Sequence, residues 1–357
     1  AWNEALGLPR PWDQQWSMRM QQIVAFETDL LEYEDLFDGN QVVDAKVEAL
    51  KASARYELET IETQGGALNA IEYMKSRLVE SNTDRLQNIE KNYTTVVGVN
   101  KFTNTEKSPL VSGDGGIMVV DPSVEKDQID RLNLWRTKRD QKLVNKALFK
   151  LKKAALDGQN IMPSSIEAAK AGATTGEWAQ EMRNIYGEYR GPTGVATGVS
   201  NKTDGLEELR SAVDAVSDKL GERLKFLIGK PGLDGHSNGA EQIASRARDC
   251  GMKIEYEGIR LTPKELVETV KATKAHVVGL SILSGSHIPL VQDMVSLLAK
   301  EGLTKIPIVV GGIIPEEDKI KLLKMGISKV YTPKDFEMNT IMMDIVDLAE
   351  PREIAAE

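Results

Sequence analysis

The stretch Ala275-His276-Val277-Val278-Gly279-Leu280-Ser281-Ile282-Leu283 is almost continuously apolar. A run of this length without polar alternation is typical of a strand that is buried on both faces of a parallel sheet. A helical pattern over residues 288–300 follows it, and the same strand–helix order recurs on both sides. The stretch therefore predicts a strand inside an α/β domain.

Five such strand–helix units can be placed after residue 223. Thr262-Pro263-Lys264-Glu265 marks one helix start, because it combines a capping box with proline at the first helical position. The pattern predicts an open, doubly wound, flavodoxin- or Rossmann-like sheet of five parallel strands. The expected strands are 224–229, 253–257, 275–283, 307–311 and 329–332, and the expected helices are 240–250, 262–274, 288–300, 316–325 and 336–348.

The chain before residue 223 is mainly helical in pattern. We expect helices over much of residues 11–92, a long helix over 122–156, shorter helices over 175–189 and 205–220, and short strands over 93–102 and 117–120. Glycine and proline punctuate a connector over residues 159–202. We therefore divide the chain into residues 1–120, a helical connector over 121–222, and the α/β domain over 223–357.

A stripe of large apolar side chains recurs at helical spacing near the start of the chain. Such a stripe is typical of core packing. Its members are Trp12, Trp16, Met20, Ile23 and Val24.

Composition narrows the functional classes. The 357 residues are 41% hydrophobic and 28% charged, as in ordinary globular domains. A net charge of −9 disfavours a broad nucleic-acid surface, and no apolar run is long enough to span a membrane. The single cysteine, Cys250, excludes an internal disulfide and follows a helical pattern, which favours packing over nucleophilic chemistry. No secretion signal opens the chain, so we expect a cytoplasmic protein; the start at Ala1 suggests a piece of a longer chain.

Ligands of doubly wound sheets bind at the carboxyl ends of the strands. The loop over residues 230–239 is long for its kind and contains Asp234 and His236, with Lys230 placed to pair with the aspartate. One histidine cannot hold a free metal ion, but it can be an axial ligand of a metal held by a macrocycle. A histidine in ordinary polar contact is the alternative that this loop alone favours.

Small residues recur in the other loops at this edge, over 281–287, 311–315 and 331–333. They suit a slot for a flat or chain-like group. Neither a G-x-G-x-x-G motif nor a P-loop is present, which disfavours NAD and nucleoside triphosphates.

Three motifs, Asp234-x-His236-x-x-Gly239, Ser281-x-Leu283 and Gly311-Gly312, resemble the cobalamin-binding domain of base-off/His-on enzymes. The resemblance implies that His236 is the ligand of cobalt and that Asp234 and Lys230 support it, so that these three form the catalytic set. It also implies a slot for the nucleotide tail of the cofactor. The residues implied in cofactor binding are Asp234, Gly235, His236, Gly239, Ser281, Leu283, Gly285, Gly311 and Gly312, with Tyr331 and Thr332 at the far rim of the slot.

Segments upstream extend the resemblance to the coenzyme-B12-dependent acyl-CoA mutases. They are Ala5-Leu6-Gly7-Leu8-Pro9, Asn160-Ile161-Met162-Pro163 and Thr174-Thr175-Gly176-Glu177-Trp178. The connector is most similar to that of ethylmalonyl-CoA mutases, and then to that of methylmalonyl-CoA mutases. The whole chain thus resembles the C-terminal half of such an enzyme, with residues 1–120 as the tail of its (β/α)8 substrate barrel.

This resemblance implies adenosylcobalamin as cofactor and a radical rearrangement of ethylmalonyl-CoA to methylsuccinyl-CoA, with methylmalonyl-CoA as the alternative substrate. Glu4 matches a position near the ribose of the adenosyl group. The full enzyme is expected to be a homodimer that binds acyl-CoA through its barrel. We expect the chain alone to be inactive and to expose apolar surface around Trp12 and Trp16.

Two other functional classes remain open. A cobalamin module for methyl transfer or sensing would share the three motifs, but it would not need the mutase connector in residues 1–200. A receiver-like signalling domain would need an acidic cluster near the first strand, and residues 224–229 offer none. The mutase hypothesis is therefore favoured.

Overall fold

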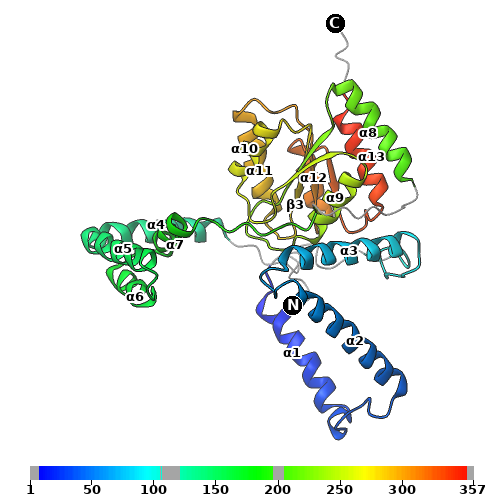
Figure 1. Ribbon diagram of the computed structural model, residues 1–357, viewed down its shortest axis with the longest axis horizontal. Coiled ribbons are helices and arrows are strands. Elements are labelled where there is room, and N and C mark those ends of the chain that lie inside the picture. The colour runs from blue at the N-terminus through cyan, green and yellow to red at the C-terminus, as the bar shows by residue number, and fades with distance from the viewer. Residues whose placement is uncertain (1–7, 105, 107–120, 196–204, 352–357) are drawn as a thin grey trace. The chain divides into compact units, whose positions relative to one another are not determined.

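The computed structural model describes residues 8–104, 106, 121–195 and 205–351. The chain divides into two compact units (Figure 1). Unit 1 combines Ala1–Met118 with Pro192–Glu357, and unit 2 is Val119–Gly191.

Unit 1 contains the predicted five-stranded parallel sheet. Its strands are β1 (Lys225–Gly229), β2 (Lys253–Tyr256), β3 (Val277–Ser281), β4 (Ile308–Gly311) and β5 (Lys329–Tyr331). They lie in the order β2-β1-β3-β4-β5, and every neighbouring pair is parallel. This is the flavodoxin-like order, in which the chain reverses direction across the sheet between β1 and β3. The predicted fold class is confirmed.

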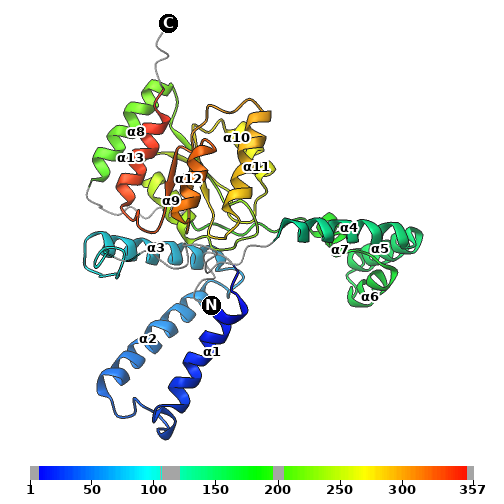
Figure 2. The same cartoon turned by 180° about the vertical axis from the view of Figure 1, so that it is seen from behind.

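Helices cover both faces of the sheet (Figures 1 and 2). On one face lie α8 (Leu206–Leu220), α9 (Asn238–Asp249) and α13 (Met338–Ala349); on the other lie α10 (Pro263–Thr273), α11 (His287–Lys300) and α12 (Glu316–Lys324). Alternate residues of a strand point to opposite faces. Phe226 of β1 therefore packs in the first core and Leu227 in the second.

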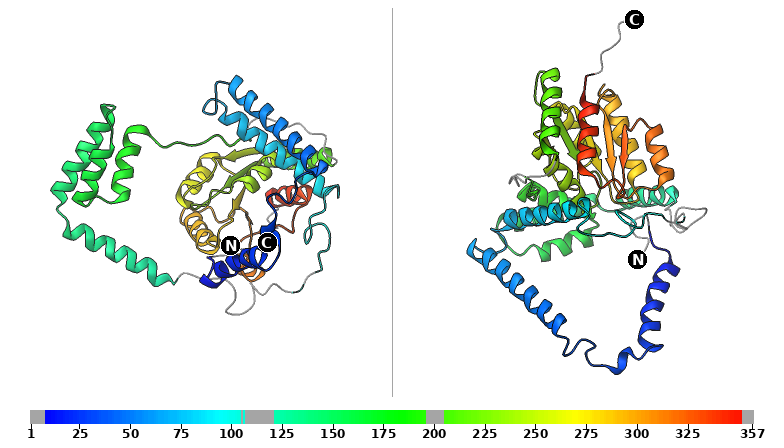
Figure 3. Two further views of the ribbon diagram at one scale, coloured as in Figure 1. Left: turned by 90° about the horizontal axis from the view of Figure 1, so that it is seen from below. Right: turned by 90° about the vertical axis from the view of Figure 1, so that its right-hand side faces the viewer.

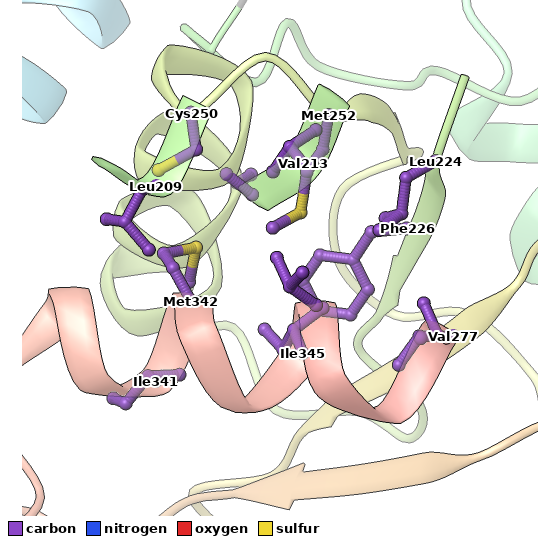
Figure 4. Packing of buried hydrophobic residues seen from close by; sticks show 14 of the residues in the cluster. Leu209, Val213, Leu224, Phe226, Cys250, Met252, Val277, Ile341, Met342 and Ile345 are labelled. Atoms are coloured by element: carbon purple, nitrogen blue, oxygen red, sulfur yellow. The ribbon is translucent and has the colours of Figure 1, made fainter. Parts of the chain in front are cut away.

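The first core surrounds Phe226, whose ring lies beside Ile345 of α13 (Figure 4). Gly279 on β3 is required here, because a Cβ at that position would come within 2.7 Å of the Phe226 ring. Cys250 is fully buried in the same core, and burial raises the pKa of its thiol to about 11. This confirms that the cysteine packs, since a thiol with so high a pKa is a poor nucleophile.

Three long helices open unit 1: α1 (Pro11–Phe26), α2 (Gln41–Thr63) and α3 (Ile71–Glu90). The prediction that the stripe on α1 is core was wrong for its exposed members, since Trp16 is 56% and Met20 69% exposed. The exposed apolar surface expected around Trp12 and Trp16 is present at Trp16, whereas Trp12 is half-buried. The strand expected over 93–102 is instead a turn closed by an isolated bridge between Val97 and Lys101. The strand expected over 117–120 lies outside the described residues.

Unit 2 is helical. The single helix expected over 122–156 is two helices, α4 (Pro122–Lys138) and α5 (Gln141–Leu156). The break occurs because the backbone of Arg139 is extended and Asp140 caps α5 with its side chain. Two further helices, α6 (Met162–Ala171) and α7 (Thr175–Tyr186), pack on α5 (Figure 3). Across the described parts of both units, no helix is long and apolar enough to cross a membrane.

Candidate functional site

A chain of three polar side chains occupies the loop between β1 and α9. Lys230 Nζ donates a hydrogen bond to Asp234 Oδ2 at 2.6 Å, and Asp234 Oδ1 lies 2.6 Å from His236 Nδ1. Burial decreases along this chain. The Lys230 side chain is 0% exposed, that of Asp234 is 6% exposed, and that of His236 is 82% exposed. The histidine is therefore presented to solvent by two buried charges.

The negative charge of Asp234 determines which ring nitrogen of His236 carries the proton in the neutral imidazole. Burial raises the pKa of the Asp234 carboxyl, but hydrogen bonds from Lys230 and His236 oppose it and leave the pKa well below its usual range. The carboxylate is thus ionised at neutral pH and accepts from the Nδ1–H of His236. In a neutral imidazole the other nitrogen, Nε2, then carries a free lone pair, as a metal ligand requires.

The strand register brings the other two motifs to the same edge of the sheet. Ser281 at the end of β3 pairs with Gly311 at the end of β4, and Gly311 pairs with Tyr331 at the end of β5. Leu283, just beyond β3, donates its backbone N–H to Asp234 Oδ2 at 3.3 Å. The three motifs therefore meet at the carboxyl ends of neighbouring strands, beside the switch point between β1 and β3.

A cavity of about 500 Å³ opens at this edge, a volume within the range of small-molecule sites. Its wall is mostly apolar and includes Ser281, Leu283, Gly239 and Gly311. A Cβ added at Gly239 or Gly311 would meet no protein atom within 4 Å, so both glycines leave space where a ligand can lie. At Gly312 a Cβ would lie 1.9 Å from the carbonyl oxygen of Ile282, so this glycine permits close packing of the backbone.

Tyr331 and Thr332, which were expected at the far rim of the slot, line the cavity. Tyr331 Oη donates to Asp344 Oδ2 at 2.9 Å, and burial together with this bond raises the pKa of the phenol. Thr332 donates from its backbone N–H and its hydroxyl to Asp335 Oδ2. These bonds hold both rim residues in place.

Some residues implied by the resemblance do not line the cavity. Gly235 and Gly285 lie in exposed loop positions and are not part of its wall. His236 is not part of the wall either, and it lies two residues before the wall residue Asn238. Glu4 lies outside the described residues.

One wall of the cavity comes from α3 and contains no residue of the three motifs. Asn82, Arg85, Leu86 and Ile89 all line it. Their spacing of i, i+3, i+4 and i+7 is that of one helix face, so a signal was present in the sequence. That signal could not say what the face packs against.

Polar contacts attach α3 to α9. Lys75 Nζ lies 2.6 Å from Glu241 Oε1, whose side chain is 3% exposed. Gln242 donates to the carbonyl oxygen of Val79 and accepts from the hydroxyl of Thr83. Because these groups are buried or half-buried, the bonds define the position of α3 against the cavity.

Comparison with known protein families assigns both parts of the chain. Residues 1–188 of the 357 match the family model described as methylmalonyl-CoA mutase, and residues 224–333 match the model described as B12 binding domain. The chain belongs to the methylmalonyl-CoA mutase family, and it carries a B12-binding domain at residues 224–333.

Individual relatives agree with this assignment. The ethylmalonyl-CoA mutase of Cereibacter sphaeroides is 63% identical over 357 residues, which are 100% of this chain and 55% of that protein. The ethylmalonyl-CoA mutase of Methylorubrum extorquens is 55% identical over 98% of this chain and 51% of that protein. The methylmalonyl-CoA mutase of Escherichia coli is 30% identical over 97% of this chain and 49% of that protein. The chain spans about half the length of these curated relatives.

The similarity expected from the connector is therefore confirmed: the chain is more similar to the two ethylmalonyl-CoA mutases than to the methylmalonyl-CoA mutase of Escherichia coli. The chain thus combines a segment that matches this family with a B12-binding domain.

Proposed function

We propose that this chain is the cofactor-binding half of an adenosylcobalamin-dependent mutase that rearranges ethylmalonyl-CoA to methylsuccinyl-CoA. The observation that carries the proposal is the buried Lys230–Asp234 pair, which presents His236 beside an open apolar cavity at the switch point of the sheet. The identities of 63% and 55% to ethylmalonyl-CoA mutases support the choice of substrate.

The residues of the site fit the cofactor. His236 would bind cobalt through Nε2, while Asp234 fixes the tautomer and orientation of the ring and strengthens it as a ligand. Lys230 keeps the carboxylate of Asp234 ionised although that carboxylate is buried. When bound, the cofactor supplies the radical chemistry of the rearrangement, and the protein supplies binding, orientation and exclusion of water.

The cavity would take the nucleotide tail of the cofactor. Ser281, Leu283, Gly311 and Gly312 would line the tail, and Tyr331 with Thr332 would close its far rim. We also assign cofactor binding to the loop glycines Gly235 and Gly285 and to Gly239 in the first turn of α9, and contact with the adenosyl group to Glu4. Support comes from the space left open at Gly239 and Gly311.

Turnover of an acyl-CoA would need the rest of the enzyme, since holding the thioester over the cofactor accounts for a large part of such catalysis. The corresponding domain organisation is residues 1–120 as the tail of the substrate barrel, 121–222 as connector and 223–357 as cobalamin domain. We further propose a cytoplasmic homodimer for the full enzyme, in line with the family resemblance.

Electron paramagnetic resonance of the Co(II) cofactor tests the ligand. With 15N-histidine in the protein, the cobalt signal should show coupling to one labelled nitrogen, and His236→Ala should abolish it. The matched control is His276→Asn, because His276 lies at the opposite ends of the strands, where its Nδ1 accepts from the N–H of Lys225. Coupling that survives in the His236 variant would refute the assignment.

A second experiment tests the reaction. The chain is incubated with adenosylcobalamin and either ethylmalonyl-CoA or methylmalonyl-CoA, with and without a separately produced barrel half. We expect product only with the barrel half and from ethylmalonyl-CoA. Product from the chain alone, or from methylmalonyl-CoA alone, would contradict the proposal.

A further inference from the structure

Charged side chains are few in the wall of the cavity. Arg85 of α3 is the one basic side chain in the wall among the described residues, and Asp335 is the one acidic side chain. Asp335 is engaged, because its Oδ2 accepts from the backbone N–H and the hydroxyl of Thr332. Arg85 differs: within the described parts of the chain its guanidinium has neither an ion pair nor a hydrogen bond.

The other arginine on α3, Arg77, forms ion pairs with carboxylates, as surface arginines commonly do. Arg77, two turns earlier, forms ion pairs with Glu57 and Glu80. Both Arg77 and Arg85 lie on an exposed side of the helix, but only Arg85 lines the cavity. An unpaired guanidinium at the mouth of an apolar cavity is placed to bind an anion, because its fork of N–H donors matches a phosphate or carboxylate.

The chemistry of the proposed ligand supplies such an anion. The nucleotide tail of cobalamin consists of a flat base, a ribose and a phosphodiester with one negative charge. The base suits the apolar interior of the cavity, whereas the phosphate needs a polar partner where the tail enters. The amide of Asn82, one turn before Arg85 in the same wall, adds a hydrogen-bond donor.

We propose that Arg85 binds the phosphate of the cofactor's nucleotide tail, so that α3, which lies outside the B12-binding domain, forms part of the cofactor site. This inference rests on the proposed cofactor function. It assigns a binding role to the segment before residue 91, which the three motifs do not include. The polar contacts of Lys75 and Gln242 with α9 and α3 hold the arginine at the cavity mouth.

Ligands with and without the phosphate provide the test. Dissociation constants for aquocobalamin, cobinamide phosphate and cobinamide are measured by spectral titration for the wild-type chain and for Arg85→Gln. Cobinamide has neither nucleotide nor phosphate. Because Arg85 is exposed, we expect the variant to bind the two phosphate-containing ligands about three- to tenfold more weakly and cobinamide with unchanged affinity. Arg85→Lys should recover part of the loss, since it keeps the charge.

Lys91→Gln is the matched control. It removes one positive charge at the end of α3 from a residue that does not line the cavity, so all three affinities should stay at the wild-type values. An equal loss for cobinamide and cobalamin in Arg85→Gln, or no loss for either, would overturn the role of Arg85. A wild-type chain that binds none of the three ligands would instead overturn the proposed function and this inference with it.

Discussion

Replacing Lys230 by methionine tests whether the buried charge pair supports the site. The substitution keeps the length and apolar stem of the side chain but removes a fully buried ammonium group that lies 2.6 Å from Asp234 Oδ2. Asp234 would then be a carboxylate that is 6% exposed and lacks its main counterion. Breaking a buried ion pair in this way costs about 3–5 kcal/mol of folding free energy.

The loss of folding stability in Lys230→Met should depend on pH in a defined direction. In the wild type the lowered pKa of Asp234 contributes stability above the usual carboxyl pKa, and this contribution is lost as the pH falls through the lowered value. In Lys230→Met, the hydrogen bond and the charge of the lysine no longer lower the pKa of Asp234, so much of the stability contributed by its ionised form at neutral pH is lost. The two proteins should therefore differ most above the usual carboxyl pKa, and the difference should shrink as the pH falls below that value.

Hydrogen exchange at the backbone amides of β1 and β3 is the appropriate assay. All five tryptophans lie at or before Trp178, so their fluorescence does not report on this domain. The control is Lys271→Met, whose ion pair with Glu301 is exposed and should contribute about 0–1 kcal/mol. Equal losses in Lys230→Met and Lys271→Met, or a loss in Lys230→Met that does not shrink as the pH falls below the usual carboxyl pKa, would refute the reasoning.

Three further predictions concern the connector, the cavity and the ligand chain. The hydrogen bond from Arg139 lowers the pKa of Glu177 from 4.5 to about 2, so this pair stabilises unit 2 above pH 4.5, and the stabilisation is lost as the pH falls toward 2. Urea unfolding followed by the two tryptophans of unit 2 should therefore separate Glu177→Gln from wild type at pH 7 but not at pH 2, and equal midpoints at pH 7 would contradict this. Gly311→Val should weaken cobalamin binding at least about tenfold, because its side chain would enter the cavity where the ligand lies, with little change in melting temperature. Gly312→Ala should lower the melting temperature, because its Cβ would collide with a backbone carbonyl. If Gly311→Val binds cobalamin like wild type, the cavity is not the tail slot. Asp234→Asn should reduce cobalamin affinity about 10–100-fold while the fold persists, and an unchanged dissociation constant would count against its role in supporting the ligand.

The predicted α/β domain agrees with the structure because its signals are local. Apolar runs predict β1 and β3, and the capping box at Thr262 defines the start of α10, where the threonine and Glu265 exchange hydrogen bonds as expected. The boundary between α4 and α5 was not predicted, because its local sequence signal is weak. The break at Arg139 and Asp140 leaves the helical periodicity on both sides intact, so only the backbone conformation reveals it.

The prediction that the apolar stripe on α1 is buried was wrong for a different reason. Helical spacing of Trp12, Trp16 and Met20 predicts a helix with an apolar face, and the helix is present as α1. Whether such a face is buried depends on a partner surface, which periodicity does not describe. In this chain Trp16 and Met20 remain exposed.

In the α/β domain the sequence alone determines the order of strands and helices and the identity of the loop that carries Asp234 and His236, because periodicity, capping and glycine punctuation act over a few residues. The tertiary structure decides which strand ends become neighbours, and so aligns Ser281 with Gly311. It also decides that α3 closes the cavity and brings Arg85 to its mouth. Contacts between residues far apart in the chain depend on which apolar faces bury each other. The free energy of this burial arises only when the elements pack together, so no single segment of the sequence determines it.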